Sequence, residues 1–194
     1  MKHTGQLGIF ILVLLLALAG CQGRQTPKEP VASAAGPLED GGSTTQIEAE
    51  AVEHDFRLKL YADNSVYRTD EAIQIWATLE YIGEDSTATI WHSNPYVVFS
   101  ITDGADFHAD GVVDSILTST ELNQGELYRF DYVKSGSYDA SAPNADFWEA
   151  FYQEDTLMLP AGTYTISVDG AFYLSDQLLD AEKGPSCTLQ ITVQ

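Results

Sequence analysis

Cys21 is the residue whose neighbours say most about its chemistry. It follows an apolar run of eleven residues, Ile9 to Ala19, and the small residue Gly20 separates the run from the cysteine. The run has the length of the apolar part of a secretory signal, and it is too short to span a bilayer, which takes about 20 residues. Cleavage before Cys21 would expose a thiol that a lipid-transfer enzyme can alkylate. The sequence therefore predicts a signal peptide over residues 1–20 and lipid attachment at Cys21.

The segment Leu18-Ala19-Gly20-Cys21 resembles the lipobox of bacterial lipoproteins. In that family the small residues let the signal peptidase reach the bond, and the cysteine carries the lipid. The resemblance implies palmitate or a similar acyl chain on Cys21 and a place on the outer side of the cell membrane. Two or more acyl chains hold a protein stably there, because each buried methylene contributes about 0.8 kcal/mol. The alternatives are an ordinary signal peptide and an uncleaved anchor.

The sequence lacks the common motifs of catalysis and metal binding. It has no G-x-S-x-G turn, no Walker or dinucleotide-binding glycine pattern and no H-E-x-x-H pair. His54, His92 and His108 do not stand at metal-ligand spacing, so we expect no metal site and no cofactor. Cys187 belongs to an alternating apolar series and is expected to be a buried structural thiol. These observations favour a protein that is not an enzyme.

An acidic segment, Asp103-Gly104-Ala105-Asp106 followed by Asp110, raises the question of calcium. It places three carboxylates within eight positions, and calcium prefers oxygen ligands. The segment lacks the D-x-D-x-D-G pattern and the closing glutamate of an EF-hand loop. In a chain with 29 acidic residues, a solvated loop is the more economical interpretation.

Aromatic residues are the better candidates for binding. Trp91 to Tyr96 joins two expected strands, and Pro95 predicts a turn in the middle of this segment. Trp91, His92 and Tyr96 would then form a rim for a sugar ring or a peptide, and Trp148 would form a second platform. Of these residues, we expect His92 and Trp148 to be exposed. The alternative is that both groups pack in the core, where buried aromatic rings are common.

The chain divides into three parts by composition. Residues 21–54 follow the signal peptide and are rich in Pro, Gly, Ser, Thr and Glu, which predicts a disordered tether. Residues 55–194 show apolar residues at every second position in segments of five to ten residues, separated by Gly, Asp, Asn and Ser. This pattern predicts an all-β domain of the antiparallel β-sandwich type.

One short helix is expected to cover an end of this sandwich. Asn144 is a suitable N-cap, and Asp146 falls in the first turn. Phe147, Trp148 and Phe151 follow at spacings of three and four, which places their side chains on one side of a helix.

Two turns carry a further resemblance. Leu122-Asn123-Gln124-Gly125 precedes Tyr128, and Leu159-Pro160-Ala161-Gly162 precedes Tyr164. These turns resemble the tyrosine corner of immunoglobulin-like and fibronectin-like sandwiches, in which the hydroxyl bonds back to the backbone. From Phe56 onward the chain also resembles intracellular-proteinase-inhibitor-like modules and uncharacterised lipoproteins of Gram-positive bacteria. That resemblance implies an immunoglobulin-like fold.

Charge limits the possible partners. The formal net charge of −20 argues against nucleic acid, because phosphates would be repelled. We therefore expect a membrane-anchored envelope lipoprotein that binds a protein or a cell-wall glycan through its sandwich. One alternative is a regulator of envelope proteases that inserts a long loop, within 103–124 or 135–144, into a protease cleft. Another is a glycan-acting enzyme, which would need two carboxylates about 5 to 9 Å apart.

Overall fold

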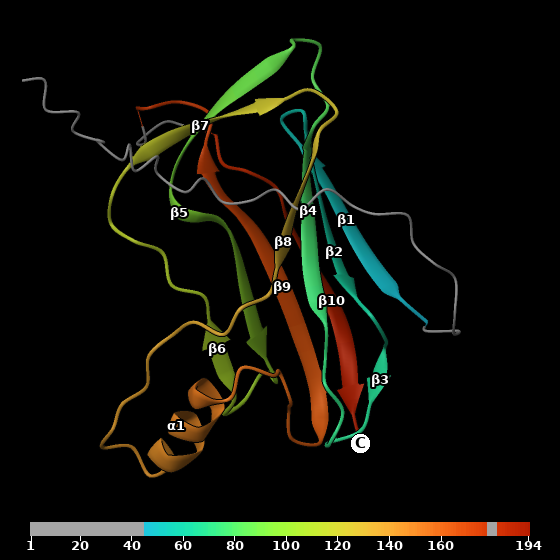
Figure 1. The fold of residues 1–194 in the computed structure, drawn as a ribbon, viewed down its shortest axis with the longest axis vertical. Helices are drawn as coiled ribbons and strands as arrows, with labels where there is room; N and C mark the ends of the chain where they lie inside the picture. The colour runs from blue at the N-terminus through green and yellow to red at the C-terminus, as the bar shows by residue number, and fades with distance from the viewer. Residues whose placement is uncertain (1–44, 178–181) are drawn as a thin grey trace, which may run out of the picture. The chain divides into compact units, whose positions relative to one another are not determined.

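The computed structural model describes residues 45–177 and 182–194 (Figure 1), so the predicted signal peptide, Cys21 and most of the predicted tether lie outside the described residues. No helix among the described residues is long and apolar enough to cross a membrane. In chain order the elements are β1 (Ile47–Glu53), β2 (Phe56–Ala62), β3 (Val66–Tyr67), β4 (Ile75–Tyr81), β5 (Thr87–Thr102), β6 (His108–Asp110), β7 (Thr118–Asn123), β8 (Leu127–Asp131), α1 (Ala145–Gln153), β9 (Gly162–Tyr173) and β10 (Ser186–Val193).

The strands form two sheets that pack as a sandwich. One sheet has the order β1-β2-β4-β8, and the other has the order β3-β10-β9-β5-β6, with β7 also paired to β5. Every pair among these strands is antiparallel except β3 with β10, which is parallel. The predicted all-β, immunoglobulin-like sandwich with one short covering helix is confirmed.

The alternating pattern of β2 shows why the sheets pack in this way. Phe56, Leu58 and Leu60 are buried between the sheets, and the residues between them face outward. Arg57 donates a 2.6 Å hydrogen bond to Glu80 on β4, and Lys59 lies 3.0 Å from Glu50 on β1. Opposite charges on neighbouring strands support the same register that buries the apolar side chains.

β1 corrects the predicted boundary of the tether. Residues 47–53 were expected to be disordered, but they pair with all of β2, and Glu53 stands opposite Phe56. The inward positions of β1 carry Ile47, Ala49 and Ala51, which pack against the core. Two of these side chains are small, so the strand has little apolar signal of its own. Its stability depends on β2, which the local sequence does not reveal.

The helix α1 begins where the sequence predicted, but Asn144 does not cap it through its side chain. Phe151 is buried, and its ring lies 5.5 Å from that of Phe107, in the segment just before β6. This contact explains why α1 lies beside β6 in Figure 1. The helix therefore covers one end of the sandwich by packing an aromatic face on it.

Both predicted tyrosine corners are present. The hydroxyl of Tyr164 donates a 3.0 Å hydrogen bond to the carbonyl of Pro160. The hydroxyl of Tyr128 accepts a 2.9 Å hydrogen bond from the backbone N–H of Asn123 and donates one of 2.9 Å to Glu126. Each tyrosine thus fixes the turn that precedes its strand.

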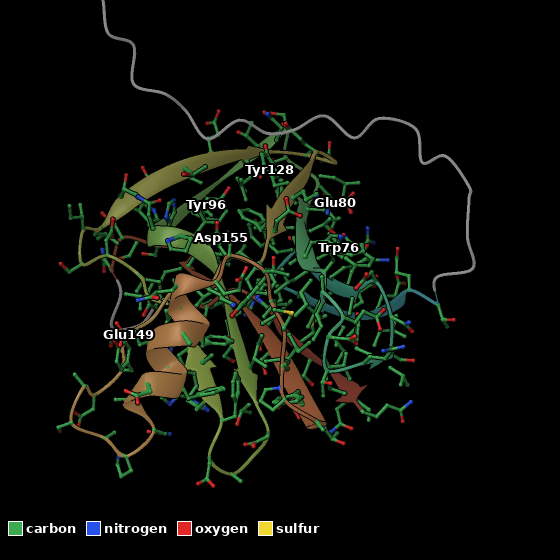
Figure 2. The ribbon with its side chains drawn as sticks, turned by 60° about the horizontal axis from the view of Figure 1, so that its bottom comes forward. Trp76, Glu80, Tyr96, Tyr128, Glu149 and Asp155 are labelled. Atoms are coloured by element: carbon green, nitrogen blue, oxygen red, sulfur yellow. The ribbon has the colours of Figure 1, made fainter. Side chains whose placement is uncertain are left out.

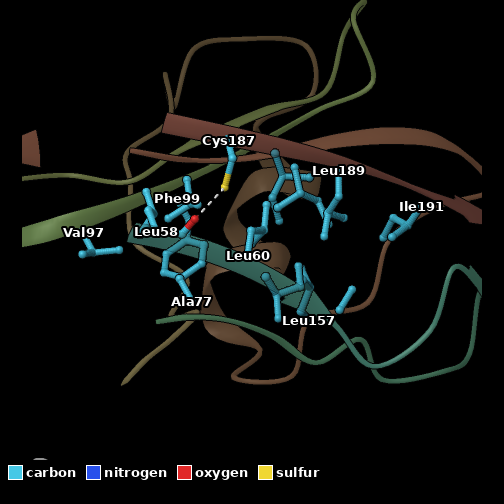
Figure 3. Close-up of a cluster of buried hydrophobic side chains, with 14 of the residues drawn as sticks. Leu58, Leu60, Ala77, Val97, Phe99, Leu157, Cys187, Leu189 and Ile191 are labelled. Atoms are coloured by element: carbon cyan, nitrogen blue, oxygen red, sulfur yellow. Dashed lines mark hydrogen bonds between the residues drawn. The ribbon is translucent and has the colours of Figure 1, made fainter. Parts of the chain in front are cut away.

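Cys187 is the buried thiol that the alternation predicted. Its Sγ lies 3.8 Å from the carbonyl oxygen of Leu58 in the opposite sheet (Figure 3). Burial raises the pKa of this thiol to about 11, so very little thiolate forms near neutral pH.

We expect this burial to suppress alkylation. In a Cys21→Ala chain, which keeps Cys187 as its one cysteine, iodoacetamide at about pH 8 should react at least about 100-fold more slowly in buffer than in denaturant, because the thiolate is the nucleophile. Mass spectrometry over time measures both rates. Equal rates would show that the Cys187 side chain is accessible in the native protein.

Candidate binding groove at the open edge of the sandwich

The segment around Pro95 is a bulge inside one strand and not a turn between two strands. β5 runs through Thr87–Thr102, and its pairing with β9 shifts between His92 and Val97. The Asn94–Pro95 peptide bond is cis. The expected turn was wrong because a proline, which has no N–H for the ladder, is also accommodated at a bulge.

His92 is buried, contrary to the expectation that it is exposed. Only 2% of its surface is accessible. Its Nδ1 lies 3.0 Å from the carbonyl of Ser93, and its Nε2 lies 2.8 Å from the hydroxyl of Thr120. Since a carbonyl only accepts, Nδ1 carries the proton, and Nε2 of a neutral ring accepts from Thr120. Both ring nitrogens are satisfied, so burial costs little.

A row of aromatic rings continues from His92 across the edge of the sandwich. The ring centroid of Tyr96 lies 4.6 Å from that of His92 and 5.2 Å from that of Phe130 on β8. Burial raises the pKa of Tyr96 to about 12, which keeps its phenol neutral. The row joins β5 in one sheet to β8 in the other, at the side where no strand closes the described sandwich.

The four aromatic candidates do not form one site. Trp91 precedes His92 on β5, so its side chain points to the opposite face of the sheet. Trp148 is half-buried on α1, with its ring 5.1 Å from that of Phe107. The structure thus brings together His92 and Tyr96 and leaves the two tryptophans apart. A binding role for any of the four stays a prediction.

An apolar groove lies beside this aromatic row. Its volume is about 260 Å³, and it separates β5 from β8 and from the segment that follows β6. The residues that line it are Pro95, Val97, Val98, Phe99, Gly111, Val112, Phe130, Asp131, Val133 and Ser135.

Exposed aliphatic side chains lie at the groove and in the adjoining 111–117 segment. Val133 is 74% exposed and Ile116 is 68% exposed. We call five residues the aliphatic rim: Val112, Val113, Ile116, Leu117 and Val133. Four of the five lie in the short connection between β6 and β7. Sequence reasoning missed them because the flanking Gly and Asp residues marked this stretch only as a loop.

Hydrogen bonds to the bulge hold the rim in place. The backbone N–H of Asp114 donates to the carbonyl of Asn94 at 2.8 Å, and the carboxylate of Asp114 accepts from the N–H of Asn94 at 3.1 Å. The same carboxylate accepts from the N–H of Ile116 at 3.2 Å. The rim is therefore organised by the fold before any partner arrives, which lowers the entropic cost of binding.

Three carboxylates lie at or beside the groove. Asp131 lines it, and Asp110 and Asp114 flank the rim residues in the chain. Arg129 lies 2.7 Å from Asp131 and is paired with it, and Lys134 donates to three backbone carbonyls. His108 lies 2.8 Å from Asp110, so the carboxylate of Asp114, which accepts from backbone N–H groups, is the charge that favours a cationic partner.

The acidic segment before β6 is built as a turn. One carboxylate oxygen of Asp103 accepts hydrogen bonds from the N–H groups of Ala105 and Phe107, at 2.8 and 3.0 Å. These bonds hold the pKa of Asp103 below its usual value. Across residues 45–177 and 182–194, no three His, Cys, Asp or Glu side chains stand close enough to hold a metal ion together.

No protein-family model matches the chain, and no curated protein sequence is similar to it. Among solved structures, a β-glucosidase from Erythrobacter marinus is similar over 79% of this chain and 16% of its own length, with a TM-score of 0.36 and 13% sequence identity. The chain thus spans a small part of that enzyme. A similarity this distant carries no argument about function. The candidate site is therefore assigned from the geometry of this chain alone.

Proposed function

We propose that this chain is a lipid-anchored, non-enzymatic binding module of the bacterial envelope, which binds a protein partner at the apolar groove. Lipid attachment at Cys21 is supported by the lipobox-like segment. The observation that carries the binding role is the aliphatic rim, because organised aliphatic side chains gathered on the surface of a soluble domain mark interaction sites.

The partner segment that fits this groove is extended and basic. β8 has a strand neighbour, β4, on one side only, so its other edge is open to a further strand among the described residues. A segment in which Val, Ile or Leu alternates with Lys or Arg would place aliphatic side chains against the rim. Its cations would face Asp110, Asp114 and Asp131.

A peptide binding assay tests this proposal. The full chain, purified in mild detergent, is titrated with a fluorescent peptide of sequence KVKVKVKVK and with matched peptides EVEVEVEVE and KSKSKSKSK. We expect the first peptide to bind at least about 10-fold more tightly than the other two, and about 0.5 M salt to weaken it. Equal binding of all three peptides, or no binding of the first, would refute the proposal.

Variants locate the binding surface. The double variant Ile116→Ser, Val133→Ser should weaken binding of the KVKVKVKVK peptide by at least about 10-fold, because both side chains contribute apolar area. Val52→Ser is the matched control, since Val52 is 53% exposed on β1, outside the groove. Equal effects of the two changes would place the binding elsewhere.

A second candidate is the regulator of envelope proteases. The predicted inserting loop 103–124 is interrupted by β6 and β7, so it is not one continuous loop. Residues 135–144 form an exposed segment without helix or strand, and this observation favours them as the loop of such a regulator. Cleavage of a casein substrate by isolated envelope proteases should then fall in the presence of the chain, and unchanged cleavage at micromolar excess would count against this role.

A further inference from the structure

A second hollow lies on the other side of β8 from the groove. Its volume is about 410 Å³, within the range of about 300 to 1,000 Å³ that small-molecule sites occupy. It is formed by β4, by the end of β8 and by the segment after α1, and we call it the Trp76 cleft. The residues that line it are Ala72, Ile73, Gln74, Ile75, Trp76, Arg129, Asp131, Tyr132, Asp155, Thr156 and Leu157.

Lys134 fixes one wall of this cleft. Its Nζ donates three hydrogen bonds, to the carbonyls of Phe151, Glu154 and Thr156, at 2.8, 2.7 and 2.7 Å. These carbonyls lie at and just beyond the end of α1, where a cation is favourable. The N–H of Ile73 also donates to the carbonyl of Leu157 at 2.9 Å. The backbone that carries Asp155 is thus held at both ends.

The opposite wall is an ordered stack of side chains. The rings of Trp76 and Tyr61 are nearly parallel, with centroids 5.3 Å apart and an angle of 11° between them. The guanidinium of Arg129, on the strand to the other side, lies 4.8 Å from the centroid of the Trp76 ring. Nε of Arg129 donates to Asp131 at 2.9 Å. The stack fixes the indole and the guanidinium, so the wall is preorganised.

The polar groups of the cleft include both donors and acceptors. Arg129 donates, Asp131 and Asp155 accept, and the side chains of Gln74 and Thr156 do both. The carboxylate of Asp155 is exposed, and its charge acts on the nearby ammonium of Lys134, where it raises a pKa that burial lowers. Figure 2 shows Asp155 just beyond α1 and Trp76 on β4. The carboxylate of Asp155 is therefore accessible to a ligand.

The charge of the lining restricts the ligand. The guanidinium of Arg129 and the ammonium of Lys134 balance the carboxylates of Asp131 and Asp155. Both cations are already engaged, Arg129 by Asp131 and Lys134 by three carbonyls, so the cleft favours a neutral ligand over phosphates and carboxylates. The half-buried Trp76, with small exposed parts of Ile73 and Ile75, gives apolar surface beside the polar groups. A ligand with hydroxyls on its edges and C–H groups on its faces satisfies both kinds of surface, and a neutral sugar ring has this chemistry.

We propose that the Trp76 cleft binds a neutral saccharide, with Asp131 and Asp155 accepting from sugar hydroxyls and Arg129 donating to a sugar oxygen. Asp131 also lines the apolar groove, but Gln74, Arg129 and Asp155 line only the cleft, so the inference does not depend on peptide binding at the groove. A primary amine is the competing ligand chemistry, because the carboxylate of Asp155 is exposed, and the experiment separates the two.

The chain contains three tryptophans, so labelling it with ¹⁵N-tryptophan gives one indole N–H signal for each, assigned from single Trp→Phe variants. The full chain in detergent is titrated with cellobiose, N,N′-diacetylchitobiose and maltose, and separately with glucuronate and cadaverine. We expect at least one neutral disaccharide to shift the Trp76 signal saturably, with a Kd in the millimolar range, and to leave the signals of Trp91 and Trp148 in place. Glucuronate should cause no saturable shift.

Two variants test the assigned contacts. Asp155→Asn should raise the Kd of the disaccharide by about 10-fold, because a hydrogen bond to a charged acceptor is replaced by one to a neutral acceptor. Gln74→Ala is a second, independent change in the cleft, and it should also weaken binding. Glu149→Gln, on α1 and outside the cleft lining, is the matched control and should bind as the unchanged chain does. Saturation by cadaverine alone, no saturable shift with any neutral disaccharide, or equal affinity of all three variants would overturn the proposal.

Discussion

A Cys21→Ala variant should leave the membrane fraction almost completely. If the lipobox-like segment directs acylation, the thiol of Cys21 is the attachment point, and its loss removes every acyl chain bound through it. Each methylene buried in the bilayer contributes about 0.8 kcal/mol, so the loss of two or more chains removes tens of kcal/mol of anchoring. Fractionation of cells and labelling with a palmitate analogue measure the two consequences together.

Cys187→Ala is the matched control for this experiment. Cys187 lies buried in the core and should have no part in anchoring, so that variant should keep both the label and its place in the membrane fraction. An uncleaved apolar anchor predicts the opposite for Cys21→Ala, namely retention in the membrane without the label. Retention with the label would show that the lipid is attached elsewhere.

Leu58→Ala should lower the free energy of unfolding by about 2 to 5 kcal/mol. Leu58 has no exposed surface and lies between the two sheets, close to Cys187 (Figure 3). Its truncation removes apolar contacts on both sides and leaves a cavity that rigid strands cannot close. Urea denaturation followed by circular dichroism gives the change.

Val52→Ala provides the comparison, because Val52 lies on the neighbouring strand and is exposed. We expect that substitution to change stability by less than about 0.5 kcal/mol. Similar losses for the two variants would contradict the assignment of inner and outer faces. The slope of the denaturation curve should not differ between them, since the surface exposed on unfolding is nearly unchanged.

The features that the sequence predicted correctly depend on local pattern. Leu58 and Leu60 alternate with charged residues, and Ile166 and Val168 alternate with Thr and Ser, so the inner faces of β2 and β9 are evident. Tyr164 follows a Leu-Pro-Ala-Gly turn and bonds back to Pro160 as predicted. In each case the information lies within a few residues.

The features that were missed depend on partners far along the chain. β1 has small inward residues and forms because β2 offers opposite charges and a complete register. His92 is buried because Thr120, on β7, satisfies one of its ring nitrogens. No periodicity within the Trp91–Tyr96 segment encodes that contact, and a polar ring beside a proline favoured exposure.

Neither the apolar groove nor the Trp76 cleft could be predicted from local sequence, because each is formed by residues far apart in the chain. The apolar groove joins a bulge in β5 to the segments that follow β6 and β8. The Trp76 cleft needs Lys134, after β8, and the N–H of Ile73, before β4, to hold the chain that follows α1. The residues involved were visible in the sequence as isolated aliphatic, aromatic or charged positions, and only the fold brings them together.

Site-specific photocrosslinking in intact cells tests most directly whether the aliphatic rim is where a partner binds. A photoreactive amino acid replaces Ile116 in one strain and Val52 in another, and mass spectrometry sequences the crosslinked peptides. We predict adducts at position 116 to an extended segment that alternates aliphatic residues with Lys or Arg, and none of these at position 52. The same peptides at both positions, or peptides at position 116 without basic residues, would contradict the account.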